Sequence, residues 1–199
     1  MKKNGFFLHF GKQLPSIKTL YIFFIFLVLF NLILIGLLAQ NIEKKRFMRE
    51  LEGYVEASSQ EFGVPKAVIF AVMRAESDFN QYARSSADAR GLMQITAVAL
   101  TDINRMLSES YTMTQMYDPE INIRCGTAYL SLLYQKYKIY ATAFTAYNAG
   151  QGNVDTWLGD SRYSNDRKQL YHVPFDETLN YVKKVNQYYS EYQKQYGEN

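Results

Sequence analysis

The sequence is poor in the residues that disulfide and metal chemistry require. It contains one cysteine, Cys125, so no intramolecular disulfide can form. Its two histidines, His9 and His172, lie far apart and give no zinc-ligand spacing. We therefore expect neither a metal ion nor another cofactor. Cys125 itself lies in an apolar stretch, and we interpret it as a small buried hydrophobic residue.

Clustered positive charge is also missing from most of the chain. The net charge is +3, but the sequence up to Ile42 contains four lysines and no acidic residue. Without these four, 18 of the 22 basic residues remain against 19 acidic ones, which gives a net charge of −1. Proteins that bind nucleic acid normally carry clustered Lys and Arg, so we expect no nucleic-acid partner.

Strand-like patterns are absent as well. No segment alternates apolar and polar residues over a convincing length, and there is neither an internal repeat nor a low-complexity tract. Apolar residues recur instead at three- and four-residue intervals, which is typical of helices. At 199 residues the chain can form one domain with a sizeable core plus appendages. We expect an all-α fold.

One long apolar run stands out near the N-terminus. Thr19 to Ile42 gives 24 consecutive uncharged residues, and at ~1.5 Å per residue such a helix exceeds the ~30 Å hydrocarbon core of a bilayer. The alternative is a cleaved secretory signal, whose apolar region is usually only about 7 to 15 residues long and ends at a small-x-small site. The nearest candidate site begins with the bulky Leu37. We therefore favour an uncleaved transmembrane anchor.

The charges beside this run leave its orientation open. Four lysines precede it, and Lys44, Lys45, Arg46 and Arg49 follow it closely, so the positive-inside rule barely discriminates. The predicted organisation is an N-terminal segment (1–18), a transmembrane helix (19–42), a helical stalk (43–53) and a main domain (54–199).

The main domain contains a helix that places a carboxyl group on an apolar face. Pro65 suits the first turn of this helix, and Glu76 shares a face with Val68, Ile69, Val72 and Met73 through i, i+3 and i+4 spacing. Residues 77–91 are polar and are predicted to form a loop. Further helices are predicted at about 92–107, 119–133, 141–147, 154–158 and 175–196.

Glu76 is the strongest candidate for a catalytic group. Desolvation and the negative end of the helix dipole should both raise its pKa, because both disfavour the ionised form. A carboxyl group that stays protonated near neutral pH can act as a general acid. The structural alternative is a buried ion pair with Arg74 or Arg90.

Five short motifs, in order, resemble the catalytic domain of soluble lytic transglycosylases, whose fold is similar to goose-type lysozyme. The resemblance runs from about Tyr54 to Tyr192. The motifs are Glu76-Ser77-x-Phe79-Asn80; Ser85 followed by Ala89-Arg90-Gly91-Leu92-Met93-Gln94; Asp118-Pro119-Glu120-x-Asn122-Ile123 with Gly126-x-x-Tyr129-Leu130; Ala146-Tyr147-Asn148-Ala149-Gly150; and Val173-Pro174-Phe175-x-Glu177-Thr178-x-x-Tyr181-Val182.

The resemblance implies an enzyme that cleaves the glycan strands of peptidoglycan, with Glu76 as both acid and base. It also implies that six further residues line or brace the glycan groove, although each could serve a structural role instead. They are Ser85, Gln94, Tyr147, Asn148, Glu177 and Tyr181. Asp78 would point to roughly the opposite side of the helix from Glu76, and the family implies no second carboxylate at Asp88 or Glu177. A hydrolase of lysozyme type and a glycan-binding scaffold without activity remain as alternatives.

Because peptidoglycan lies outside the cytoplasmic membrane, the resemblance also implies that residues 1–18 are cytoplasmic and that the main domain is exterior. Three positions depart from the family pattern. The family commonly has Pro at the position of Gln81, Gly at Asp88 and Pro at Ala97. All three fall in expected loops or helix starts, so they bear on loop shape and substrate preference more than on the reaction.

Overall fold

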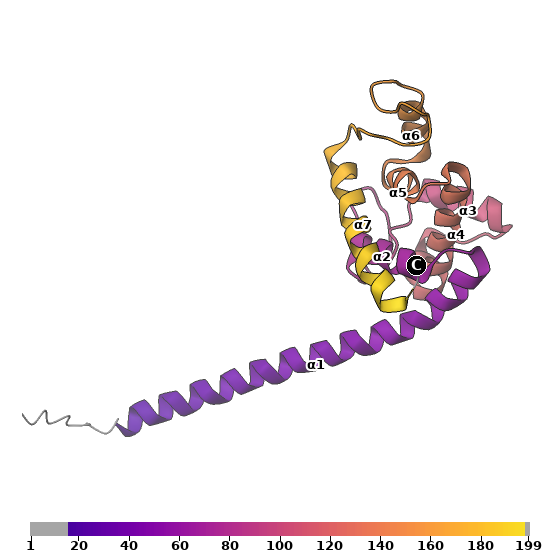
Figure 1. Ribbon diagram of the computed structural model, residues 1–199. Coiled ribbons are helices and arrows are strands. Elements are labelled where there is room, and N and C mark those ends of the chain that lie inside the picture. The colour runs from indigo at the N-terminus through magenta and orange to yellow at the C-terminus, as the bar shows by residue number, and fades with distance from the viewer. Residues whose placement is uncertain (1–15, 198–199) are drawn as a thin grey trace, which may run out of the picture. The chain divides into compact units, whose positions relative to one another are not determined.

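The computed structural model describes residues 16–197 (Figure 1). The chain divides into two compact units, Met1–Phe47 and Met48–Asn199, and the division falls within the first helix, α1 (Ile17–Phe62). Within residues 16–197 there is no β-strand, only isolated bridges that join Arg90 to Arg84 and Ile95. The predicted all-α fold is therefore confirmed.

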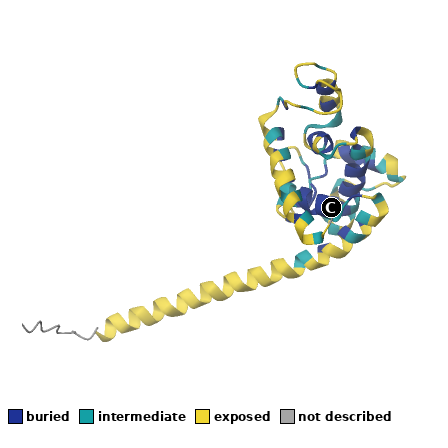
Figure 2. Ribbon diagram, viewed as in Figure 1, coloured by how far each residue is buried: buried dark blue, intermediate teal, exposed yellow. Residues whose placement is uncertain are grey.

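The first unit is the N-terminal part of α1. Its described residues up to Arg46 are all exposed, including the apolar side chains, as the yellow ribbon in Figure 2 shows. By length and composition α1 is long and apolar enough to cross a membrane. A helix of exposed Leu, Ile and Phe is unfavourable in water and favourable in hydrocarbon.

The second unit begins with the C-terminal part of α1. Leu51 and Val55 are fully buried there, so the compact unit starts at Met48 and takes in residues that we expected to belong to the stalk. The rest of this unit consists of α2 (Lys66–Ser77), α3 (Ala97–Leu107), the 3₁₀ helix η1 (Met113–Tyr117), α4 (Pro119–Tyr137), α5 (Tyr140–Ala149), α6 (Gln151–Leu158) and α7 (Asp176–Tyr196).

The core of the second unit forms around α2. Residues 67–73 are all buried, and α2 packs mainly against α7. The Phe70 ring lies 5.5 Å from the ring of Tyr192 and 5.3 Å from that of Tyr196, between centroids. Cys125 on α4 is fully buried, as expected. Because residues 67–73 of α2 are buried, polar side chains of this helix reach solvent only at its two ends.

Three predicted helix boundaries were wrong by three residues or more, and one of them is the start of α6, which lies at Gln151 rather than at residue 154. The helix expected from residue 92 starts only at Ala97, because Thr96 caps it by accepting a hydrogen bond from the Ala99 amide. Residues 92–94 form a turn instead, and Ile95 forms a β-bridge with Arg90. The helix expected to end at Leu133 continues to Tyr137. Apolar periodicity marks the buried stripe, but caps decide where a helix begins and ends.

Candidate active site

Glu76 lies in the last turn of α2, immediately before the helix ends. Asp78 adopts a left-handed conformation (φ 47°) and its amide bonds to the Arg74 carbonyl, which closes the helix. Glu76 is partly exposed and lines a cavity of about 370 Å³. The walls come from α2, α5 and α7, and the lining residues are Ala75, Glu76, Asn148, Glu177, Asn180, Tyr181 and Lys184.

The environment of Glu76 favours its protonated form. Burial raises the pKa of its carboxyl group to about 7, while the Tyr181 hydroxyl and the Lys184 charge pull the pKa down more weakly. The predicted rise is confirmed. Neither suggested arginine pairs with Glu76, because Arg74 bonds to Glu191 at 2.6 Å and Arg90 bonds to Asp88. Glu76 is thus a desolvated acid that opens into a cavity.

Two tyrosine hydroxyls lie around this carboxyl group. The Tyr147 hydroxyl donates a hydrogen bond to the Met93 carbonyl at 2.8 Å. The Tyr181 hydroxyl is buried and has no partner with regular hydrogen-bond geometry, so its interaction with Glu76 is a poorly aligned contact. Burial and the nearby Glu76 raise the pKa of both tyrosines well above the usual value, which keeps them neutral donors.

Asn148 joins this cavity to a second one. Its side-chain oxygen accepts a hydrogen bond of 2.8 Å from the Thr178 hydroxyl, which fixes the end of α5 against the start of α7. The second cavity has a volume of about 230 Å³ and shares Asn148 with the first. Its lining includes Gln94, Tyr129, Tyr147 and Gly150. Together the two cavities form a polar and aromatic surface on either side of Asn148.

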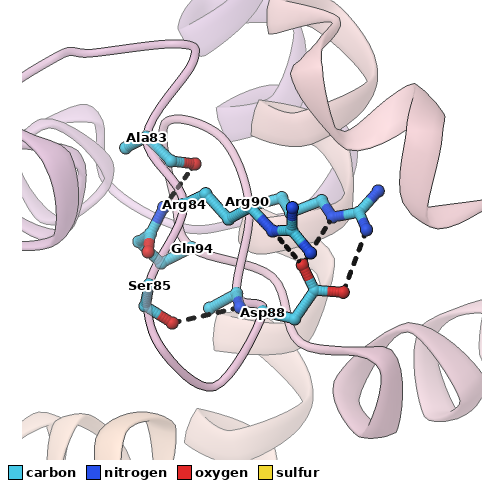
Figure 3. A network of polar contacts seen from close by, with 7 residues as sticks. Ala83, Arg84, Ser85, Asp88, Arg90 and Gln94 are labelled. Atoms are coloured by element: carbon cyan, nitrogen blue, oxygen red, sulfur yellow. Dashed lines mark hydrogen bonds and ion pairs between the residues drawn. The ribbon is translucent and has the colours of Figure 1, made fainter.

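The loop before α3 is held by its own hydrogen bonds (Figure 3). The Gln94 amide nitrogen donates to the carbonyls of Ala83 (3.1 Å) and Gly91 (2.9 Å). The Ser85 hydroxyl accepts a bond of 3.1 Å from the Ala89 amide, is exposed and lines neither cavity. Gln94 therefore braces the loop while facing the second cavity, whereas the Ser85 side chain bonds within the loop and lies outside both cavities.

Gly91 allows this loop to approach the rest of the domain. It has φ +79°, and an added Cβ would collide with the Met116 carbonyl and the Asn122 amide group. Asn122 is buried and uses that amide to donate to the carbonyls of Arg90 (2.9 Å) and Met116 (2.8 Å), while its oxygen accepts from the Met93 amide (2.7 Å). The glycine and the asparagine together fix the backbone of residues 90–93, immediately before Gln94.

Sequence comparison decides the family. Residues 53–170, more than half of the chain, match the Transglycosylase SLT domain. The chain belongs to the transglycosylase SLT family. It is 40% identical over 131 residues to a soluble lytic murein transglycosylase of Escherichia coli K12, and the aligned region covers 63% of this chain and 20% of that protein. It is 41% identical over 114 residues to membrane-bound lytic murein transglycosylase C of Sodalis glossinidius, covering 51% and 32%.

Solved structures of the SLT family share the fold. The 70 kDa soluble lytic transglycosylase of Escherichia coli superimposes with a TM-score of 0.65 at 33% identity, covering 73% of this chain and 24% of that one. A complex of the 70 kDa soluble lytic transglycosylase with bulgecin A gives 0.67 at 32% identity, covering 77% and 26%. The predicted lysozyme-like fold is confirmed. This chain spans only a fifth to a third of the length of these relatives.

The departures from the SLT pattern have local explanations in the backbone. Asp88 has φ 59°, a conformation that suits the family's glycine and that Asp tolerates better than most residues. Its carboxylate accepts from Arg84 (2.5 Å) and Arg90 (2.9 Å), as Figure 3 shows. Gln81 follows Asn80 in a turn closed by the Ala83 amide, a position that favours proline. Ala97 is the first residue of α3, where proline is also common.

Sequence reasoning missed the two further polar residues of the Glu76 cavity, Asn180 and Lys184. Both belong to α7, and Lys184 follows Glu177 and Tyr181 at the i+7 and i+3 positions of one helix face. That spacing was visible in the sequence. Among residues 16–197, no group of three or more His, Cys, Asp or Glu side chains could hold a metal ion.

Proposed function

We propose that this protein is a membrane-anchored lytic transglycosylase. It cleaves the β-1,4 bond between N-acetylmuramic acid and N-acetylglucosamine in peptidoglycan and leaves a 1,6-anhydro-N-acetylmuramic acid end. The proposal rests on one observation above all: Glu76, with a pKa of about 7, opens into a cavity of the SLT domain.

In the proposed reaction one carboxyl group acts twice. Protonated Glu76 donates its proton to the glycosidic oxygen as the bond to the anomeric carbon breaks. The N-acetyl group of the substrate stabilises the positive charge that develops at that carbon. Glu76, now ionised, takes the proton of the muramic acid 6-hydroxyl as this oxygen bonds to the anomeric carbon. A pKa near neutrality lets the same group serve as acid and then as base.

We assign the proposed groove residues according to where they lie. Asn148, Glu177 and Tyr181 line the Glu76 cavity, and Gln94 and Tyr147 line the adjoining one. All five are proposed to contact or position the glycan. Ser85, the sixth residue expected from the family pattern, is proposed to act on the groove only through the shape of its loop.

A hydrolase of lysozyme type is the second candidate, because Glu177 lies in the same cavity as Glu76. Hydrolases generally use two carboxyl groups about 5 to 9.5 Å apart. Digestion of purified peptidoglycan followed by mass spectrometry distinguishes the two reactions. Anhydro ends, retained after Glu177→Gln, are expected. Products with only reducing ends would overturn the transglycosylase assignment.

A scaffold that binds glycan without cutting it is the third reading. Binding alone does not require a desolvated acid in the cavity, which is why we favour an enzyme. Glu76→Gln is expected to abolish cleavage while glycan binding persists. Turnover equal to that of the wild type would remove Glu76 from its proposed role.

The apolar part of α1 is proposed to anchor the protein in the cytoplasmic membrane, in keeping with the membrane-bound enzymes among its relatives. The substrate then dictates the orientation, with residues 1–18 in the cytoplasm and the SLT domain outside. In intact spheroplasts, added protease should digest the SLT domain. Full protection of the domain would contradict this orientation.

A further inference from the structure

Lys184 is the one basic residue that lines the Glu76 cavity. It lies on the exposed side of α7, and among residues 16–197 its ammonium group forms no ion pair with a carboxylate. Within the described part of the chain it interacts electrostatically with Glu76. Lys184 therefore brings an unneutralised positive charge to the place where the glycan is proposed to bind.

Among residues 16–197, no neighbouring carboxylate forms an ion pair with this ammonium group. Glu177 lines the same cavity but precedes Lys184 by seven residues, which is roughly 10 Å along a helix at ~1.5 Å per residue. Glu191, the next acidic residue on α7, is bonded to Arg74 at 2.6 Å. Glu76 has a pKa of about 7, so near neutral pH it is protonated much of the time and offers only a partial negative charge. An anion of the substrate is the group that could complete the site.

We propose that Lys184 determines substrate specificity by binding a carboxylate of the peptidoglycan strand beside the bond that Glu76 cleaves. The inference rests on the proposed function and names a feature of the substrate that it requires. N-Acetylmuramic acid carries a lactyl ether that ends in a carboxylate when the strand is free of peptide. When a stem peptide is attached, that carboxyl group is an amide and the nearest carboxylates belong to the peptide. N-Acetylglucosamine carries none.

The test measures binding by the full-length Glu76→Gln protein in detergent micelles. Without Glu76, an effect of Lys184 on its protonation cannot disturb the result. Two matched pairs of glycan fragments serve as ligands. The first pair is peptide-free, with the lactyl carboxylates either free or methyl-esterified, and the second bears stem peptides with carboxylates either free or amidated.

Lys184→Met is expected to weaken binding of a carboxylate-bearing fragment about tenfold or more, from the lower end of the range for one hydrogen bond between charged groups. Binding of the neutralised partner fragment should stay the same. Lys184→Arg should restore most of the loss, because it keeps the charge. Lys183→Met is the matched control, since Lys183 is an exposed neighbour that does not line the cavity, and it should bind like the parent protein.

The two pairs identify the source of the carboxylate. If Lys184→Met weakens binding only of the peptide-free fragment with free carboxylates, Lys184 binds the lactyl group. If it weakens binding only of the peptide-bearing fragment with free carboxylates, Lys184 binds the stem peptide. Weaker binding of both fragments means that Lys184 accepts a carboxylate from either source. Equal weakening for charged and neutralised fragments, or no weakening, would overturn the inference. If wild-type protein forms anhydro ends while Lys184→Met binds normally, only this inference fails. If the Glu76→Gln protein binds no fragment, both proposals fail.

Discussion

Replacing Glu76 with Gln should stabilise the folded protein in a manner that depends on pH. Burial raises the pKa of Glu76 from 4.5 to about 7 in the folded state. Below pH 4.5 the group is protonated in both the folded and the unfolded chain, and it does not oppose folding. Between pH 4.5 and 7 the unfolded chain ionises first, so stability falls as pH rises. The fall levels off above pH 7.

The size of this effect follows from the shift in pKa. A shift of roughly 2.5 units, at 1.36 kcal/mol per unit, corresponds to about 3 kcal/mol as an upper limit. Glutamine has nearly the same shape but does not ionise. The free energy of unfolding of the variant minus that of the wild type should therefore grow by up to about 3 kcal/mol between pH 4.5 and 8.5.

Denaturant titrations of the full-length wild type and Glu76→Gln in the same detergent, at one-unit pH steps, measure this difference. Other titrating groups contribute equally to both proteins and cancel. The same protonation step should lower the cleavage rate of the wild type above about pH 7, because the general acid is then ionised. A stability difference that stays constant from pH 4.5 to 8.5 would refute the claim that Glu76 is desolvated in the folded protein.

Three further substitutions test the surroundings of the site. Tyr181→Phe removes a hydroxyl that lowers the Glu76 pKa, so the alkaline limb of the pH–rate profile should move to higher pH; a shift to lower pH would be contrary to the structure. Ala97→Pro should stabilise the domain by about 0.4–1 kcal/mol, because Thr96 already has the extended conformation that a following proline requires (φ −87°, ψ 160°). Thermal unfolding measures this change, and a loss of stability would argue against this cap geometry. Gly91→Ala should destabilise the domain by about 2 kcal/mol or more, since its Cβ meets the backbone and Asn122 at a positive φ, and wild-type stability in denaturant would show that the loop can relax.

Some features of the site were predictable because they depend on local spacing. Glu76 shares a helical stripe with Val72 and Met73, so its approach to the core follows from the sequence alone, as does the direction of its pKa shift. The order of motifs likewise indicated the family that residues 53–170 match. The start of the helix at Ala97 was predicted five residues too early, because the turn and β-bridge before it contain three apolar residues, Leu92, Met93 and Ile95, that are buried by tertiary contacts.

The sequence by itself determined a helical protein with an apolar segment long enough to span a membrane, and it determined which carboxyl group lies on an apolar face. A periodicity of about 3.6 residues and the length of an uncharged run are local properties, so they need no knowledge of the fold. Only the tertiary structure decided what surrounds that carboxyl group. Packing of α7 against α2 brings together residues about a hundred positions apart, so Arg74 pairs with Glu191 and Lys184 shares the cavity of Glu76. Arg90 pairs instead within its own loop, with Asp88.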